Sequence, residues 1–273
     1  MIGLQEAAER LGVHYMTVYR YVRTGRLPAV KRGGEWRVEP AALERLRRVQ
    51  EAPRRRRPPR AGAAERLLDR LLAGDELGAW NVVESALASG AQPSEVHLDL
   101  VVPALRTIGE DWAAGRLSVA DEHRASVVAR RILGRLGVLF TRRGRKRACV
   151  VLGAVAGERH EIPGAIVADQ LRAAGFDVVD LGADTPTESF VAAARRYRPL
   201  CVLISVTAPG HDAALRATVA ALRAEADVAV LVGGAAVPDE RTARAVGSEA
   251  FTGTDARAVV AAVENMLARR LGG

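Results

Sequence analysis

The sequence predicts a multidomain protein with a winged helix-turn-helix head, a four-helix bundle, and a doubly wound α/β domain with a parallel sheet. Three observations support this prediction. Two short helical segments precede a Gly-Gly hairpin, apolar residues then recur at helical spacing, and apolar strands finally alternate with helices. The chain has 273 residues, which is enough for two or three domains. The expected boundaries are 1–50 for the head, 51–63 for a linker, 64–143 for the bundle and 144–273 for the α/β domain.

The head is expected to contain two helices, a hairpin and a third helix. Leu4–Leu11 and Tyr15–Thr24 have the pattern of short helices, and Gly25 is placed to cap the second. Gly33-Gly34 separates two short strand patterns, which predicts a tight hairpin. Pro40 follows the hairpin and is placed to open the third helix.

Positive charge is concentrated at the N-terminal end of the chain. Residues 1–60 hold 15 Lys and Arg against 6 Asp and Glu, a net charge of +9, whereas the remaining 213 residues hold 25 against 26. This asymmetry indicates a polyanionic partner at one end only. With Trp36 anchoring the hairpin, the head resembles the DNA-binding domain of MerR-type and excisionase-like regulators. The alternative is a basic module that binds protein, because short helix-turn-helix patterns are common.

The resemblance implies that the second helix enters the major groove of an operator in double-stranded DNA. The side chains expected on its exposed face, where they would meet bases and phosphates, are Thr17, Tyr19, Arg20 and Arg23. On the wing, the side chains expected to contact the DNA backbone are Arg32 and Arg37. The Pro- and Arg-rich linker is expected to be an extended tether, either plainly solvated or touching phosphates without sequence preference.

Residues 64–140 show helical spacing throughout. Four helices with short connections predict a bundle. In the second helix, Leu77, Trp80, Val83 and Leu87 follow one another at spacings of three, three and four residues. This spacing places the four side chains on one face, which is expected to be buried.

Strand and helix patterns alternate from residue 144 onward. The first strand, Ala148–Val155, has no polar side chain, as expected for a parallel strand buried on both faces. The stretch Gly157–Gly164 follows it and leads into a helix, so His160 lies in a loop at the carboxyl end of this strand. In an open α/β sheet, ligands bind at that end. Taken alone, His160 would more often be a solvent-exposed loop histidine.

The ends of the next three strands carry small, acidic or hydroxyl residues. These strand-end residues are Asp184, Ser205, Thr207, Gly233 and Gly234. A large flat ligand is therefore able to lie across this edge of the sheet. Together with Glu158-Arg159-His160, the pattern resembles the cobalamin-binding domain of methionine synthase and its relatives. The signature of that family is Asp-x-His-x-x-Gly, followed by Ser-x-Leu or Ser-x-Thr and then by Gly-Gly.

This resemblance implies that His160 is the lower axial ligand of cobalt. It also implies that the dimethylbenzimidazole tail of cobalamin is displaced into a slot lined by the Ser and Gly positions. Glu158 replaces the usual Asp, and its carboxylate is still able to accept the second N–H of the imidazole and set the tautomer. Pro163 replaces the motif glycine, with Gly164 one place later. A function without cobalamin stays open if Pro163 disrupts the loop.

A second motif lies in the predicted bundle, where Trp112 is followed after nine residues by Glu122-His123. In this domain order, the motif resembles CarH-type light-dependent repressors over essentially the whole chain. The resemblance implies that Trp112 packs over the upper face of the corrin and that Glu122 and His123 contact an adenosyl group or its surroundings. Ala113 stands where that family has a His, so a new axial ligand from this position is excluded. Alternatively, Trp112 belongs to the bundle core and Glu122-His123 to an exposed helix face.

Composition sets further limits. Cys149 and Cys201 lie inside expected buried strands, which favours core residues over a disulfide or a zinc pair. The start of the chain has no signal-peptide pattern, and no apolar run approaches the length of a membrane span. The protein is therefore expected to be cytoplasmic and to have no membrane partner.

The leading hypothesis is a cobalamin-dependent transcriptional repressor that uses adenosylcobalamin as a light sensor. Light would split a homo-oligomer, a dimer or a tetramer, and so release DNA, because linked heads bind with multiplied affinity. One alternative is a repressor that senses cobalamin abundance without light. Another is a corrinoid methyl-carrier protein, for which a basic head has no evident use. The sequence carries no other catalytic motif, so the chain is not expected to be an enzyme.

Overall fold

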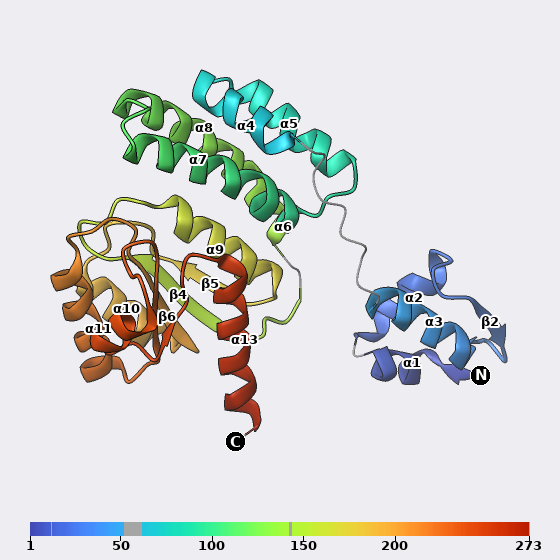
Figure 1. Cartoon of the computed structure of the whole chain (residues 1–273). Helices are drawn as coiled ribbons and strands as arrows, with labels where there is room; N and C mark the ends of the chain where they lie inside the picture. Colours follow the sequence, from blue (N-terminus) through green and yellow to red (C-terminus); the bar gives the residue numbers. More distant parts are fainter. Residues whose placement is uncertain (12, 52–61, 142–143, 273) are drawn as a thin grey trace. The chain divides into compact units, whose positions relative to one another are not determined.

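Figure 1 shows the computed structural model of the chain, which describes residues 1–11, 13–51, 62–141 and 144–272. The chain divides into two units, Met1–Arg56 and Arg57–Gly273, and each is described by itself. The predicted linker 51–63 lies almost entirely outside the described residues. Among the helices in the described ranges, none combines the length and the apolar character that a membrane crossing requires.

The N-terminal unit combines helices with a small antiparallel sheet of strand order β1-β3-β2. Its elements are β1 (Ile2–Gly3), α1 (Leu4–Leu11), α2 (Tyr15–Arg23), β2 (Ala29–Arg32), β3 (Glu35–Val38) and α3 (Pro40–Glu51). Strands β2 and β3 form the expected hairpin. Its turn residues Gly33 and Gly34 have φ angles of 59° and 85°, which glycine adopts without a Cβ clash. Trp36 is partly buried against the core that these elements share.

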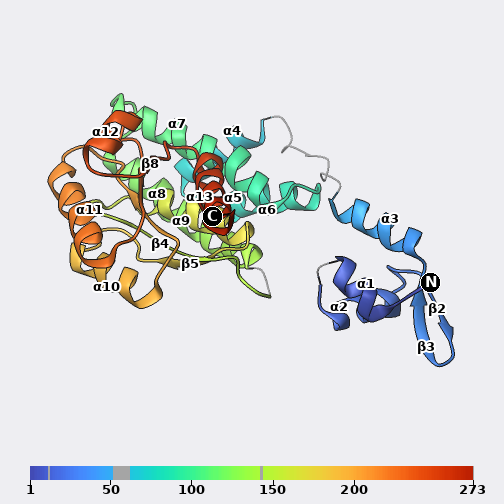
Figure 2. The same ribbon diagram turned by 90° about the horizontal axis from the view of Figure 1, so that it is seen from below.

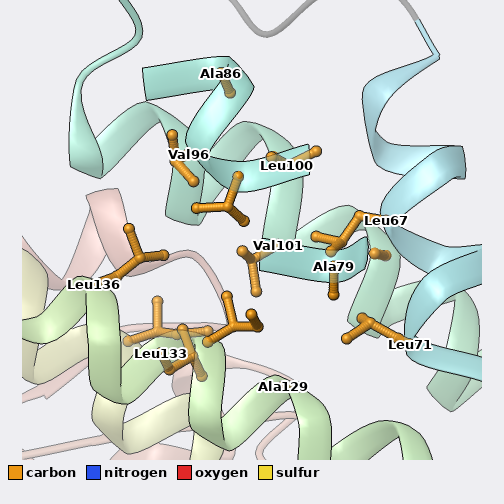
Figure 3. Close-up of a cluster of buried hydrophobic side chains, with 14 of the residues drawn as sticks. Leu67, Leu71, Ala79, Ala86, Val96, Leu100, Val101, Ala129, Leu133 and Leu136 are labelled. Carbon is orange, nitrogen blue, oxygen red and sulfur yellow. The ribbon is translucent and has the colours of Figure 1, made fainter. Parts of the chain in front are cut away.

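A helical domain follows in the second unit. Its elements are α4 (Ala63–Ala73), α5 (Glu76–Ala88), α6 (Pro93–Val96), a π-helical turn (His97–Val101), α7 (Val102–Ala113), α8 (Val119–Gly137) and a 3₁₀ turn (Val138–Phe140). Figure 3 shows buried side chains from these helices converging on one apolar core. The side chains of Asp75 and Ser118 cap α5 and α8 by accepting backbone N–H groups of their first turns. The caps therefore define where each helix begins after its short connection.

Two features of this domain differ from the sequence prediction. Leu77, expected on the buried face of α5, has 69% of its surface exposed, whereas Ala79, Val83 and Ala86 are buried. Six residues separate Leu77 from Val83, which places them about 120° apart around the helix. Trp80 and Leu87 are partly buried against the core, so the rest of the predicted face points inward and only Leu77 at its edge is exposed. The third predicted helix is also not uniform, since His97–Val101 forms a π-helical turn within it.

The α/β domain contains a five-stranded sheet in which every pairing is parallel. The strand order is β5-β4-β6-β7-β8. The strands are β4 (Cys149–Ala154), β5 (Asp177–Asp180), β6 (Cys201–Ser205), β7 (Val230–Gly233) and β8 (Ala250–Phe251). The helices are α9 (Ile162–Ala173), α10 (Thr187–Tyr197), α11 (Asp212–Ala226), α12 (Glu240–Ala245) and α13 (Ala256–Gly272). The short helix α12 was not predicted from the sequence.

Helices cover both faces of this sheet, as Figures 1 and 2 show. Helices α9 and α13 pack on one face, and α10 and α11 pack on the other. The chain adds β5 on one side of β4 and β6 on the other, so the direction of strand addition reverses at β4. A ligand crevice is expected outside the carboxyl ends of the strands at this point. The loop that carries His160 leaves β4 there.

The two cysteines belong to this sheet. Cys201 is fully buried, Cys149 is partly buried, and both are free thiols. Burial raises the pKa of Cys201 to about 12, so its thiol stays protonated and unreactive. Both cysteines therefore behave as residues of the domain core.

Candidate functional site

The loop with His160 is braced by the end of the neighbouring strand. The N–H of Gly157 donates to Oδ1 of Asp184 at 2.6 Å, and the N–H of Asp184 donates to the carbonyl of Glu158 at 2.8 Å. Asp184 therefore holds the loop in place. Pro163 lies in the first turn of α9, where a proline interrupts no helical hydrogen bond, so the helix begins normally.

Glu158 is fully buried, and its two carboxylate oxygens have different partners. Oε1 lies 2.5 Å from Nδ1 of His160 and accepts the backbone N–H of the same residue at 2.9 Å. Oε2 accepts the backbone N–H groups of Thr207 and Ala208 at 2.6 and 2.7 Å. Burial alone would raise the pKa of Glu158, but these N–H donors and the imidazole lower it to about 2. Glu158 is therefore ionised at neutral pH and ties the His160 loop to the end of β6.

The imidazole of His160 has one committed nitrogen and one available nitrogen. Nδ1 faces a carboxylate and so carries the proton, which leaves a lone pair on Nε2. The side chain is 52% exposed. A histidine with a carboxylate on its second nitrogen is the usual arrangement of a metal ligand. Across the described residues, no three His, Cys, Asp or Glu side chains are grouped to hold an ion. Nε2 of His160 is therefore available to a ligand.

A cavity of about 380 Å³ opens beside His160. On the side of the α/β domain it is lined by small residues, Ala154, Gly164, Gly182 and Ser205 among them. Residues of α8 line the opposite side, so the cavity lies between the helical domain and the carboxyl edge of the sheet. A larger groove of about 840 Å³ runs between α4 and α5, but it contains neither the histidine nor a strand end. The presence of His160 and of the strand ends therefore identifies the smaller cavity as the candidate site.

The predicted residues at the later strand ends have different roles. Ser205 lines the cavity. Oγ1 of Thr207 is buried without a hydrogen-bond partner among the described atoms, and a polar ligand group would satisfy it. At Gly233 and at Gly234, a Cβ atom would lie only 2.2 Å from the nearest protein atom. These glycines therefore let neighbouring strand ends meet, because protein atoms fill the space that a side chain would occupy at each of them.

The predicted upper-face residues lie where α7 ends and α8 begins. Trp112, in the last turn of α7, has 48% of its surface exposed, so the alternative that placed it in the bundle core is wrong. In the first turn of α8, Glu122 accepts a hydrogen bond from Ser126 at 2.5 Å, and the side chain of His123 is 72% exposed. Within the described part of the chain, no hydrogen bond or ion pair joins these side chains to the His160 loop.

Charged residues outside the predicted site join the helical domain to the α/β domain. Arg130 of α8 pairs with Glu161, the neighbour of His160, at 3.0 Å. Arg257 of α13 pairs with Asp99 at 2.6 Å. The partners lie 31 and 158 positions apart in the chain, so no local pattern marks them.

A buried histidine lies behind the cavity wall. His97 is fully buried, its ring lies 4.6 Å from that of Phe140, and neither ring nitrogen has a hydrogen-bond partner among the described atoms. Asp169, which lines the cavity, lies 4.0 Å from Nε2 of His97 and pairs with Arg172. Burial lowers the pKa of His97 to about 4 and raises the pKa of Asp169. The signal in the sequence was a polar residue on an apolar helix face.

The stability of the folded chain is expected to decrease as the pH falls from 6.5 to about 4. Over this range the unfolded chain protonates His97 while the folded chain does not, so acid favours unfolding, by about 3 kcal/mol at most. The variant His97→Leu is expected to flatten this part of the pH curve of the free energy of unfolding, measured by urea denaturation without cofactor. Asp169, whose pKa is raised by burial, contributes in the opposite direction. His123→Leu is the exposed control, and an unchanged slope in His97→Leu would contradict the prediction.

Helix α2 presents a cationic face in the N-terminal unit. Arg20 and Arg23 are exposed and form no ion pair within the described residues, whereas Arg10 and Arg37 each pair with a glutamate. Unpaired guanidinium groups on one helix suit a polyanion. On the hairpin, Arg32 is likewise exposed and unpaired within the described residues.

Two of the predicted DNA contacts are less exposed than expected. Thr17 and Tyr19 are partly buried, and Tyr19 packs against the core of the N-terminal unit. Val18 between them is fully buried, so its two neighbours flank the buried side of α2. The exposed face of the helix includes Arg20 and Arg23 instead.

Comparisons with known proteins agree with this architecture. Family models match residues 148–263 and residues 63–136, each described as a B12 binding domain, and residues 1–48, described as a helix-turn-helix domain. Fold and site together define a cobalamin-binding α/β domain with a helical cap and a helix-turn-helix domain in front of it. The chain belongs to the family of corrinoid proteins with B12-binding domains.

Curated relatives support this assignment, and a solved structure shares the fold. Trimethylamine corrinoid protein 1 of Methanosarcina acetivorans is 31% identical over 134 residues, 48% of this chain and 62% of that protein. The chain thus spans less than two thirds of that relative. Dimethylamine corrinoid protein 3 of Methanosarcina mazei is 31% identical over 126 residues, 44% of this chain and 72% of that protein. The monomethylamine corrinoid protein of Methanosarcina barkeri shares the fold, with a TM-score of 0.65 at 20% identity over 74% of this chain and 98% of that chain.

Proposed function

We propose that this protein is a cobalamin-dependent transcriptional repressor. The observation that carries the proposal is the combination, in one chain, of a helix-turn-helix domain with two B12-binding domains. A protein that only carries a corrinoid between enzymes has no evident use for a cationic head. On this proposal the chain binds its ligands and catalyses no reaction, and its DNA ligand places it in the cytoplasm.

The proposed cofactor is adenosylcobalamin, with Nε2 of His160 as the lower ligand of cobalt. The carboxylate of Glu158 on Nδ1 and the cavity of small residues beside the imidazole support this assignment. Ser205 and the hydroxyl of Thr207, which has no hydrogen-bond partner among the described atoms, supply polar groups for the tail and amides of the cofactor. The exposed Trp112 offers an aromatic surface for the adenosyl side.

The head is proposed to act as a winged helix-turn-helix of the MerR type. Helix α2 would lie in the major groove of an operator, with the β2–β3 hairpin as the wing. Arg20, Arg23 and Arg32, which form no ion pair with any residue that the structure describes, support this use of the surface. Arg37 pairs with Glu35 at 2.8 Å, and this exposed pair costs little to exchange for a phosphate.

Light is the proposed signal. Adenosylcobalamin supplies a cobalt–carbon bond that light breaks. A cofactor bound between the helical domain and the α/β domain would touch both domains. Loss of its upper ligand would then change the contacts that hold a homo-oligomer together, either a dimer or a tetramer. The number of linked heads then sets the affinity for DNA.

Two observations favour other functions. Ala113 has no lone pair for cobalt, which favours a repressor that senses cobalamin abundance without light. The relatives named corrinoid proteins, at 31% identity, favour a methyl-carrier role.

The test combines size-exclusion chromatography with DNA binding for the full-length protein. The protein is loaded with adenosylcobalamin, and samples kept in the dark are compared with samples exposed to green light. The expected result is a DNA-bound oligomer in the dark that light splits, with DNA binding lost in Arg20→Ala/Arg23→Ala and kept in Arg10→Ala. A cofactor-dependent repressor indifferent to light would identify the abundance sensor. Cofactor binding without DNA binding would identify the carrier, and a protein that binds no corrin would overturn the proposal.

A further inference from the structure

The exposed face of α2 also carries an apolar side chain. Met16, the second residue of the helix, has 56% of its surface exposed. Arg20 and Arg23 follow it at spacings of four and three residues, which places the three side chains on one face. Val18, on the opposite face, is fully buried in the core of the N-terminal unit.

Met16 lies in the part of the helix that meets base edges. In helix-turn-helix proteins, the N-terminal residues of the second helix contact bases in the major groove. His14 caps this end of α2, because its Nδ1 accepts the backbone N–H of Met16 at 3.2 Å. The backbone that presents Met16 is therefore held in place, while its side chain does not pack on the core of the unit.

We propose that Met16 recognises a thymine of the operator through the C5-methyl group of the base. In the major groove, a methyl group distinguishes thymine from the other bases, and apolar side chains recognise it by contact. The methionine side chain is unbranched and polarisable and adapts to such a surface. Arg20 and Arg23 on the same face supply guanidinium groups for guanine edges or phosphates. This inference rests on the proposed DNA-binding function and specifies a base that α2 selects.

The test begins with selection of operators from a random duplex pool. Full-length protein with adenosylcobalamin is used in the dark, in parallel with Met16→Ala. The wild type is expected to enrich operators with a thymine at one defined position. Met16→Ala is expected to enrich operators without a requirement for thymine at that position. Replacing this thymine by deoxyuridine removes only the methyl group and is expected to weaken wild-type binding about fourfold.

Variants at the same position separate the contact from a general loss of binding. Met16→Ala is expected to bind the thymine and deoxyuridine duplexes equally, and Met16→Leu is expected to keep the preference for thymine. Leu77→Ala, which removes an exposed apolar side chain outside the N-terminal unit, is the matched control and should behave as wild type. Full sensitivity to the methyl group in Met16→Ala, or none in the wild type, overturns the inference while DNA binding stands. A wild type that selects no duplex overturns the proposed function as well.

Discussion

Cobalamin bound to a His160→Ala variant is expected to lack the visible absorption spectrum of histidine-ligated cobalt. The affinity is expected to fall by more than about 100-fold, the upper range for losing only the partner of a ligand. The physical reason is that Nε2 of His160 is the available imidazole nitrogen in the cavity, while Nδ1 is committed to Glu158. Titration of the full-length protein with cobalamin, followed by visible absorption, measures both effects. Free imidazole added to the variant is expected to restore the spectrum.

Controls in the same loop make this result specific. Arg159→Ala changes the exposed neighbour and is expected to bind as wild type. Glu158→Gln is expected to lose about 10- to 100-fold in affinity, because an amide offers one acceptor oxygen to two sets of donors. Glu158→Asp keeps a carboxylate and is expected to bind more tightly than Glu158→Gln. Wild-type affinity and spectrum in His160→Ala would show that another group ligates the cobalt.

A Gly234→Ala substitution is expected to destabilise the α/β domain by roughly 3 kcal/mol or more. Gly234 has a φ angle of 111°, and a Cβ there would lie 2.2 Å from the carbonyl oxygen of Val206. The oxygen that would clash belongs to the backbone of Val206, and it accepts the N–H of Ala236 at 3.1 Å. It therefore cannot move away without disturbing this hydrogen bond between neighbouring strand ends. Thermal unfolding is expected to show a melting temperature lower by roughly 6–12 °C.

Two other glycines separate backbone strain from steric clash. Gly182 has a φ angle of 78°, and a Cβ added there would meet no other atom within 4 Å, so Gly182→Ala is expected to cost only about 1–2 kcal/mol. Gly164 lies in the first turn of α9, and a Cβ there would make an ordinary contact of 3.5 Å with Leu152. Gly164→Ala is expected to be neutral or to stabilise by up to about 1 kcal/mol. If Gly234→Ala is no less stable than Gly182→Ala, the folded protein relieves the clash with the carbonyl oxygen of Val206 and the prediction is wrong.

The helices and strands of the α/β domain and the position of His160 were predictable from patterns of residues close together in the chain. An apolar run without polar side chains identifies β4, and the parallel connection through α9 puts the loop between them at the carboxyl edge of the sheet. Glu158 and His160 are two residues apart in one loop, so their pairing was accessible from the sequence as well. The hairpin of the head followed from Gly33-Gly34 for the same reason.

Burial was harder to predict than secondary structure. On the predicted buried face of α5, Val83 is buried and Trp80 and Leu87 pack against the core, but Leu77 at the edge of that face is exposed. Thr17 and Tyr19 were expected on the outer face of α2, but the burial of Val18 draws both toward the core. Helical periodicity gives the angle between side chains, and the neighbouring elements determine which angle faces inward.

The order of the domains, the strand–helix alternation and the identity of the histidine depend on residues close together in the chain, and sequence pattern was enough for them. The surroundings of that histidine depend on residues far apart. Arg130 beside Glu161, His97 beside Asp169, and the backbone of Thr207 on Glu158 become neighbours only when the helical domain and the sheet pack together. Such contacts leave no periodic signal, because side-chain proximity across folded elements depends on packing rather than on spacing along the chain.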